Sequence, residues 1–556
     1  MTVKPRVFII GIDGATFDLI DGWVADGLLP NIGRLMREGG RGLLQSTVIP
    51  NSFPGWTSCT TGVNPAKHGI FNALIRKDLH DYRMSVVNSR DIRYDRIWQI
   101  LSREGLRVGV VNVPCSYPPV PVNGYLIGGM LSPSVESDFT YPEGLIKDVI
   151  AETGEYIIDL RSKHIPREQM RDELLRSVDA RGAAMRYLLE SRDTDFAMLV
   201  FTETDRAQHY FWADMDADHP AHTPERGEAF GDAIRKVYER VDEQVGRLVE
   251  TVGPECQIYI VSDHGFGAQP HYVYINRWLQ QHGYLKSLVR ETPGQRVRKR
   301  TKDLLESVGL LSTARTVRNK VFGEPAGARE ADLKHGQMAN KRTSIDRIIE
   351  NVDWSATTAY ALVPRGVRIN LKGREPNGIV EPIAYEALRT RLIHELKRMS
   401  YPGGENVFDR VYRREEVMDG PYIEYAPDIV TCMPVGVPSC HLEPRELFAI
   451  NTGATGSHTD WGVLIAHGPG IKAGADVVGA RLMDVTPTAL YALGIPLNDD
   501  MDGQPVVGLF TEEFTATHHI EFRENTSRAA TDRVDPFSVT EEDEIMDQLK
   551  GLGYIN

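Results

Sequence analysis

The sequence predicts an α/β protein built on a large, mostly parallel β-sheet with helices on both faces. Three observations lead to this prediction. Short apolar runs recur along the chain, helical patterns separate them, and polar residues directly follow several of the runs. Strands that are apolar throughout are typical of parallel sheets, because both faces of such sheets are covered. The length of 556 residues suits one large core with insertions, or two to three domains.

The predicted strands and helices are placed by these runs. Strands are expected at residues 7–12, 106–113, 196–201, 257–261 and 463–467. A helical pattern at 95–104 precedes the second strand, and Asp484 with the nearby Pro487 marks the start of a late helix. Ligands of such sheets bind outside the carboxyl ends of the strands. The polar residues that follow the strands are therefore expected to meet at one edge.

Composition and charge narrow the class of protein. Hydrophobic residues make up 41% and charged residues 25%, as in soluble globular proteins. The net charge of −14 argues against non-specific nucleic-acid binding, so no specific nucleic-acid partner is predicted. An anionic substrate remains compatible with this charge, because bound metals reverse the local field. The five scattered cysteines predict no disulfide framework. The absence of a secretory pattern or a membrane span of roughly 20 apolar residues predicts a cytoplasmic, soluble protein.

One segment differs in composition from the rest. Residues 286–320 hold ten Lys and Arg against three acidic residues. We interpret 285–345 as a basic helical insertion or cap, with an ordinary solvated basic face as the alternative. The core then comprises 1–284 and 346–530, and 531–556 forms a C-terminal tail.

Two pairs of residues have metal-ligand character. Asp205 and His209 are four residues apart, so on a helix both lie on one face within reach of one metal. Asp263 and His264 are adjacent, and both can reach one site only from an irregular turn, which Gly265 permits. Surface pairing and a surface turn are the respective alternatives.

Three further residues complete the set. Asp13 ends the first strand, Ser52 begins a predicted helix, and His458 lies in a glycine-containing loop. A serine at a helix start usually caps the helix. In the alternative, the helix N-terminus supports a bound anion and a metal lowers the pKa of the hydroxyl. Three aspartates, three histidines and one hydroxyl suffice to hold two divalent metals and supply a nucleophile for phosphoryl transfer.

The order of these pieces resembles a known family. An Asp-Gly turn after the first strand is followed by the Ser52 turn, Thr61-Gly62, Pro65-x-x-His68-Gly69-Ile70, Asp205-x-x-x-His209, Ser262-Asp263-His264-Gly265 and Gly456-x-His458. This arrangement resembles the type I phosphodiesterase/nucleotide pyrophosphatase family of the alkaline phosphatase superfamily. Within that family, the motifs of this chain are similar to those of the branch described as predicted phosphohydrolases or phosphomutases. The resemblance covers roughly residues 5–280 and 420–510, and it implies an alkaline-phosphatase-like fold with inserted cap segments.

The resemblance also implies a mechanism. One metal would be held by Asp205, His209 and His458, and the other by Asp13, Asp263, His264 and the Ser52 oxygen. Two zinc ions are implied, although the Asp/His set also suits manganese or iron. Ser52 stands where many members carry threonine, keeps the hydroxyl, and would form a phosphoseryl intermediate. Asn72 is near the place of a phosphate-binding asparagine, with the register off by about one residue.

The predicted function is hydrolysis of a phosphodiester or nucleotide pyrophosphate, and phosphomonoesterase or phosphomutase activity is the alternative. Lys67 and Arg206 are placed to bind the extra charge of a monoester, or else face solvent. A sulfatase requires arginine at the position of Trp56, so sulfatase activity is not expected. A non-catalytic binding protein is expected to have lost a ligand, and all seven residues are present. Aromatic residues that could contact a second substituent, with core packing as the alternative, are Phe53, Trp56, Phe71, Tyr210, Phe211 and Trp212.

Overall fold

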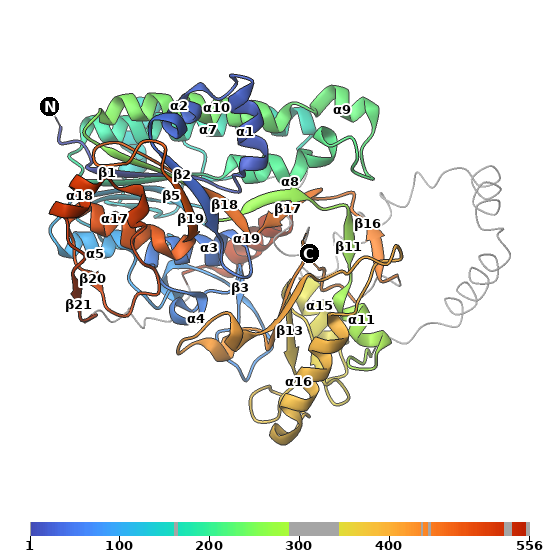
Figure 1. The fold of residues 1–556 in the computed structure, drawn as a ribbon. Coiled ribbons are helices and arrows are strands. Elements are labelled where there is room, and N and C mark those ends of the chain that lie inside the picture. The colour runs from blue at the N-terminus through green and yellow to red at the C-terminus, as the bar shows by residue number, and fades with distance from the viewer. Residues whose placement is uncertain are drawn as a thin grey trace.

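The fold is described from a computed structural model, shown as a ribbon in Figure 1. The structure describes residues 2–160, 165–288, 344–434, 438–442, 446–526 and 536–551. Most of the predicted basic insertion at 285–345 lies outside the described residues. Within the predicted tail, helix α19 (Val539–Gly551) buries Ile545 and Leu549 in the core.

A nine-stranded sheet forms the centre of the molecule, in the order β19-β2-β18-β9-β1-β8-β5-β6-β7. In chain order these strands are β1 (Val7–Ile12), β2 (Gly40–Gln45), β5 (Val108–Val113), β6 (Gly124–Gly128), β7 (Thr140–Tyr141), β8 (Phe196–Phe201), β9 (Gln257–Val261), β18 (Trp461–His467) and β19 (Asp476–Arg481). The central strands β9, β1, β8, β5 and β6 are parallel, whereas β18 is antiparallel to both of its neighbours. The predicted mostly parallel α/β sheet is thus confirmed.

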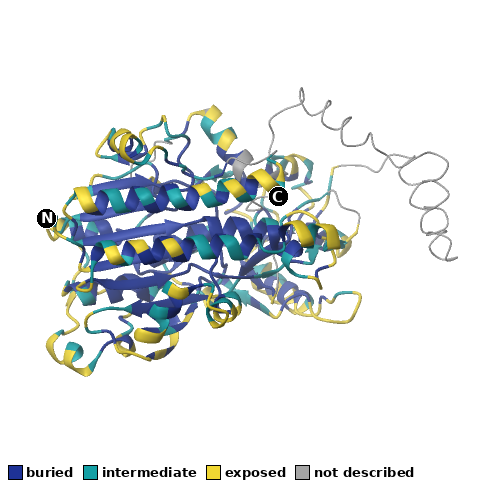
Figure 2. Ribbon diagram, turned by 90° about the horizontal axis from the view of Figure 1, so that it is seen from above, coloured by how far each residue is buried: buried dark blue, intermediate teal, exposed yellow. Residues whose placement is uncertain are grey.

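Helices cover both faces of this sheet because its strands are apolar on both sides. One face carries α1 (Phe17–Ala25), α2 (Pro30–Glu38), α7 (Arg167–Ser191) and α10 (Ala233–Val252), and the other carries α3 (Ser52–Thr61), α5 (Ile97–Arg103) and α17 (Val485–Leu493). On β1, Phe8 and Ile10 pack on the first set of helices, and Val7 and Ile9 on the second. Figure 2 shows buried strands beneath a helical layer whose outer side is exposed.

A small subdomain lies beside the large sheet. Its four-stranded sheet has the order β12-β13-β15-β14, formed by β12 (Ala359–Tyr360), β13 (Gly366–Ile369), β15 (Ile429–Cys432) and β14 (Arg410–Arg413), with helix α16 (Pro382–Leu396). The sequence predicts that the core resumes at residue 346, whereas the next strand of the nine-stranded sheet is β18. The short apolar segments that form strands of the large sheet and of the small sheet have similar composition, so composition alone does not separate the two units.

Two of the four two-stranded sheets in the described residues contain the strands that come directly after β9 in the chain. They pair β10 (Gly265–Ala268) with β17 (Gly456–Thr459), and β11 (His271–Val273) with β16 (Phe448–Ile450). All five cysteines are buried, and all are free, in agreement with the prediction of no disulfide framework. No helix in the described ranges is both long and apolar enough to cross a membrane.

Candidate active site

Three adjacent parallel strands, β9, β1 and β8, end at the same edge of the large sheet. Asp13 follows β1, and Asp263 and His264 follow β9. Asp205 lies on helix α8 (Glu203–Met215), which begins just after β8. The parallel strands therefore bring together residues that are far apart in the sequence, at the edge where the sequence predicts them.

Asp205, His209 and His458 form one group of ligand atoms. Helix α8 places Asp205 Oδ1 3.5 Å from His209 Nε2. His458 lies on strand β17 rather than in a loop, and its Nε2 is 3.3 Å from Asp205 Oδ1 and 3.0 Å from His209 Nε2. Two nitrogens held at 2.0–2.1 Å by one tetrahedral zinc lie about 3.3 Å apart. The three atoms thus have the spacing of ligands to one ion.

Ser52, Asp13, Asp263 and His264 form the second group. Ser52 Oγ is 3.3 Å from Asp13 Oδ1 and 3.2 Å from His264 Nε2. His264 Nε2 is also 3.1 Å from Asp263 Oδ2, a buried atom that accepts no hydrogen bond from the described part of the chain. The His264 and His458 rings stack with centroids 3.8 Å apart, so the two groups adjoin.

The ligand atoms of these groups overlap around His264. The ligand atoms of Asp205, His264 and His458 all lie within 4.8 Å of one another. The ligand atoms of Asp13, Asp263 and His264 also lie within 4.8 Å of one another. His264 belongs to both sets, which is the arrangement expected of two neighbouring ions. The two buried His/Asp clusters are consistent with a binuclear metal site.

The three histidines all turn Nε2 toward the centre of the cluster. Each Nδ1 lies against a backbone carbonyl: Gly456 at 2.9 Å for His209, Gly265 at 3.1 Å for His264 and Pro50 at 3.2 Å for His458. Because a carbonyl only accepts, each Nδ1 must carry the proton and each Nε2 a lone pair. Histidines that bind metals are commonly oriented in this way. The lone pairs of His209 and His458 face each other, an arrangement that a cation between them stabilises.

Three fully buried carboxylates give the cluster its electrostatic character. Burial and the charges of Asp263 and Asp205 raise the pKa of Asp13 well above its usual value. Burial and Asp205 raise the pKa of Asp263 to about 8. Burial alone would also raise the pKa of Asp205, but its histidine neighbours and Arg206 outweigh it and lower that pKa. A divalent cation at this place would relieve the repulsion among the carboxylates.

The type I phosphodiesterase / nucleotide pyrophosphatase family matches residues 7–324, more than half of the chain. The chain belongs to this family. Crystal structures of phosphonoacetate hydrolase from Sinorhizobium meliloti 1021, in complex with phosphonoacetate and with phosphonoformate, are similar at 16% identity, with TM-scores of 0.54 and 0.53. Each match covers 88% of this chain and 95% of the hydrolase.

The similarity to phosphonoacetate hydrolase establishes an alkaline-phosphatase-like fold, as the sequence predicts. A human ectonucleotide pyrophosphatase / phosphodiesterase 5 structure matches at 11% identity with a TM-score of 0.49, covering 91% of this chain and all 100% of that one. No curated protein matches the chain.

Ser52 is the first residue of helix α3. The helix is capped by Asn51, whose side chain accepts a hydrogen bond from Phe53 N at 3.1 Å. Ser52 therefore does not cap the helix, and its hydroxyl faces Asp13. Trp56, one turn further on, donates from Nε1 to Asp13 Oδ2 at 2.9 Å. The sequence reading missed this role, although the four-residue spacing from Ser52 indicates a shared helix face.

Arg206 does not face solvent. It is 1% exposed, and its guanidinium group donates to Asp205 Oδ2 at 2.6 Å and to Asp159 Oδ2 at 2.8 Å. It thus holds the carboxylate oxygen of Asp205 that points away from the histidines. Asp159 belongs to none of the sequence motifs, so only the structure shows that it pairs with Arg206.

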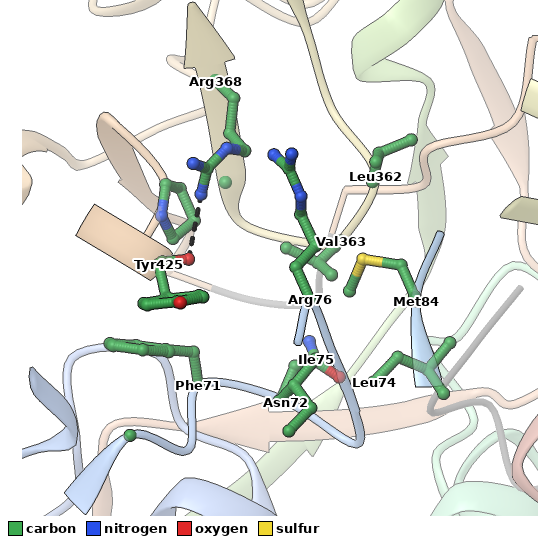
Figure 3. Close-up of a pocket in the computed structure, with 13 residues that line it drawn as sticks. Phe71, Asn72, Leu74, Ile75, Arg76, Met84, Leu362, Val363, Arg368 and Tyr425 are labelled. Atoms are coloured by element: carbon green, nitrogen blue, oxygen red, sulfur yellow. Dashed lines mark hydrogen bonds between the residues drawn. The ribbon is translucent and has the colours of Figure 1, made fainter. Parts of the chain in front are cut away.

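The two predicted substrate contacts have other partners. Lys67 Nζ pairs with Asp502 Oδ1 at 2.6 Å and donates to the Asp500 carbonyl at 2.8 Å. Asn72 is buried, and its Oδ1 accepts a hydrogen bond from Ala73 N at 2.6 Å. Lys67 is thereby tied to the 500–502 segment, whereas Asn72 lines a cavity that adjoins the small subdomain (Figure 3).

Proposed function

We propose that the chain is a two-metal phosphohydrolase that cleaves phosphodiester or nucleotide pyrophosphate bonds with Ser52 as the nucleophile. The observation that carries this proposal is the position of the Ser52 hydroxyl between Asp13 and His264, beside the second group of ligands. All seven residues come from the core ranges 1–284 and 346–530. Membership of the phosphodiesterase family supports the same chemistry.

The residues present fit two divalent metals. Asp205, His209 and His458 would hold one ion, and Asp13, Asp263, His264 and the Ser52 oxygen would hold the other. The spacing of 3.0–3.5 Å within the first group supports this assignment, as does the buried Asp263 Oδ2 without a hydrogen-bond donor among the described residues. Zinc suits nitrogen and carboxylate ligands at this spacing, and manganese or iron suit the same donors. Bound metals would neutralise charge on the phosphoryl oxygens and favour the ionised hydroxyl.

The chain's own residues prepare Ser52 for attack. Its proton can pass to Asp13 Oδ1 at 3.3 Å, because a carboxylate oxygen that binds a metal keeps a second lone pair, whereas His264 Nε2 at 3.2 Å has only the lone pair that the metal would take. Asp13 is itself fixed by Trp56, and its backbone carbonyl accepts a hydrogen bond from Thr204 Oγ1 at 2.6 Å. In-line attack would form the Oγ–P bond while the bond from phosphorus to the leaving oxygen breaks. Water would then release the phosphoryl group from Ser52.

The charges around the cluster favour a diester over a monoester. A monoester carries an additional negative charge, and Lys67 and Arg206 are the two cations that the sequence offers for it. Their observed partners are Asp502 and Asp205, respectively. Both cations are thus already neutralised, which supports a substrate with a single charge on phosphorus.

The test compares an aryl phosphodiester, an aryl phosphomonoester and an aryl sulfate on the metal-loaded full-length chain. We expect the highest kcat/KM for the diester. Ser52→Ala, assayed at saturating zinc because one proposed ligand is lost, should lower turnover by at least about 1,000-fold with unchanged Tm, because the covalent step is lost. Ser191→Ala, at the exposed end of α7, is the matched control. Full activity in Ser52→Ala would remove Ser52 as the nucleophile, and equal or faster sulfate hydrolysis would overturn the choice of substrate.

A further inference from the structure

Asp159 is a buried aspartate in the segment between helix α6 (Leu145–Thr153) and helix α7. Its side chain is 4% exposed. Both of its carboxylate oxygens accept hydrogen bonds from Arg206, Oδ1 from Nε at 3.2 Å and Oδ2 from Nη2 at 2.8 Å. A carboxylate that meets two nitrogens of one guanidinium group in this way is among the strongest partners that an arginine can have.

The same guanidinium group also contacts a proposed metal ligand. Arg206 Nη1 donates to Asp205 Oδ2 at 2.6 Å. The other oxygen, Asp205 Oδ1, lies 3.3 Å from His458 Nε2 and 3.5 Å from His209 Nε2. The carboxylate of Asp205 is therefore oriented by Arg206 on one side, and it presents its second oxygen to the two histidines.

This contact places a positive charge next to a proposed metal site. Arg206 is 1% exposed, so water and salt screen its charge only weakly, and by itself it would repel a divalent cation. The carboxylate of Asp159 lies on the same guanidinium group and carries the opposite charge. Because Arg206 and Asp159 together add no net charge, an ion in the first group would still meet the full charge of Asp205.

A second arginine joins Asp159 to the helix that carries the ligands. Arg181 on α7 is fully buried, and its Nη1 lies 2.6 Å from Glu203 Oε1 in the first turn of α8. Its Nη2 donates at 2.9 Å to the carbonyl of Ile158, the residue before Asp159. Arg181 thereby connects the segment that carries Asp159 to the start of the helix that carries Asp205.

We propose that Asp159 is a positioning residue for the first metal, because it neutralises Arg206 and so allows Arg206 to orient Asp205 without repelling the ion. The inference rests on the part of the proposed function that assigns one ion to Asp205, His209 and His458. A buried ion pair with a purely structural role would stabilise the fold and leave the metal affinity unchanged. The two roles therefore differ in what a loss of charge at Asp159 does to metal binding.

Zinc affinity of the full-length chain, measured by competition with a chromophoric chelator, tests this role without turnover. His209→Ala identifies the step of the titration that belongs to the first ion. Asp159→Asn keeps the size of the side chain and removes its charge, and we expect it to weaken that step by roughly 10- to 100-fold. Asp159→Ser serves if Asp159→Asn does not fold.

The matched control is Asp214→Asn, at the far end of the same helix. The Asp214 side chain is also buried, and its Oδ2 lies 2.5 Å from Arg167 Nη1. Loss of this charge should lower the free energy of unfolding in urea, because it leaves a guanidinium group uncompensated. Zinc affinity should stay within about threefold of that of the wild type, because Asp214 lies outside the two groups of ligands.

A double variant separates charge from packing. Arg206→Met in the Asp159→Asn background removes the uncompensated cation, so the double variant should bind the first zinc at least about threefold more tightly than Asp159→Asn does. Unchanged zinc affinity in Asp159→Asn, or a double variant that binds zinc no more tightly than Asp159→Asn, would overturn the proposed role of Asp159.

These measurements also separate the inference from the proposed function. Phosphoester hydrolysis by the wild type together with unchanged zinc affinity in Asp159→Asn would overturn the role of Asp159 alone. The expected zinc affinities in a chain that cleaves no phosphoester would support that role and contradict the proposed function. A wild-type chain that binds no zinc would overturn both.

Discussion

His68 is a buried histidine whose neutral form is built into the fold. Its Nδ1 accepts a hydrogen bond from Ile70 N at 3.1 Å, so its proton resides on Nε2, which donates to Ser58 Oγ at 2.9 Å. Burial lowers the pKa of His68 from its usual 6.5 to about 3. Between these two values the unfolded chain binds more protons than the folded chain. The stabilising effect of neutral His68 is therefore complete above pH 6.5 and is lost as the pH falls toward 3.

The two pKa values set the size of this effect. Linkage gives a loss of about 2 kcal/mol in the free energy of unfolding between about pH 7 and about pH 5. His68→Gln removes the titration while keeping an amide donor for Ser58. Urea unfolding of both proteins at both pH values, with the same metal content, measures the difference, and the contribution of other titrating groups cancels in the subtraction. Equal pH dependence in the two proteins would refute the reasoning.

Three other outcomes concern the metals and the small subdomain. Chelation should lower Tm by several degrees and zinc should restore it, because three buried carboxylates then repel one another; an unchanged Tm would contradict the metal assignment. Arg365→Met should weaken zinc affinity by roughly 10- to 100-fold in a chelator competition, because the His458 carbonyl loses its hydrogen-bond donor. Arg391→Met, at an exposed position, should leave zinc affinity unchanged. Equal zinc affinities in the two variants would mean that Arg365 contributes only to packing. Glu375→Gln should lower the free energy of unfolding in urea by about 3–5 kcal/mol, because it leaves buried guanidinium groups uncompensated. Glu381→Gln, at the surface, should cost under about 1 kcal/mol, and a similar loss in both variants would argue against the Glu375 network.

Local patterns made much of the fold predictable. The strands at 7–12, 196–201 and 257–261 have the predicted bounds, because apolar runs of that length between turn residues are encoded locally. The spacing of Asp205 and His209 likewise predicts their common helix face. The strand at 463–467 shows the limit: its residues resemble those of the parallel strands, yet it runs antiparallel, because strand direction depends on the path of the chain.

The role of Ser52 illustrates a finer limit. Its position at a helix start is compatible with a cap or with a nucleophile. A shift of one residue removes Ser52 from the cap position, because Asn51 adopts the extended backbone of a cap, with φ of −162°, and accepts the bond from Phe53 N, whereas the role of Ser52 as nucleophile is our proposal. That choice follows from backbone angles near the sheet edge, which the residue types alone do not determine.

The sequence by itself located five of the nine strands of the large sheet, supplied the set of proposed metal ligands, and predicted that Asp13, Asp205 and Asp263 follow strand ends. Only the tertiary structure decided which atoms meet. His209 and His458 face each other across 3.0 Å although 249 residues separate them, and Arg365 reaches His458 from a different sheet. The structure also neutralises Arg206 with Asp205 and Asp159, which a helical pattern alone would allow to face solvent. Local periodicity encodes strands and helix faces, whereas the distances between remote side chains arise only when the complete chain packs.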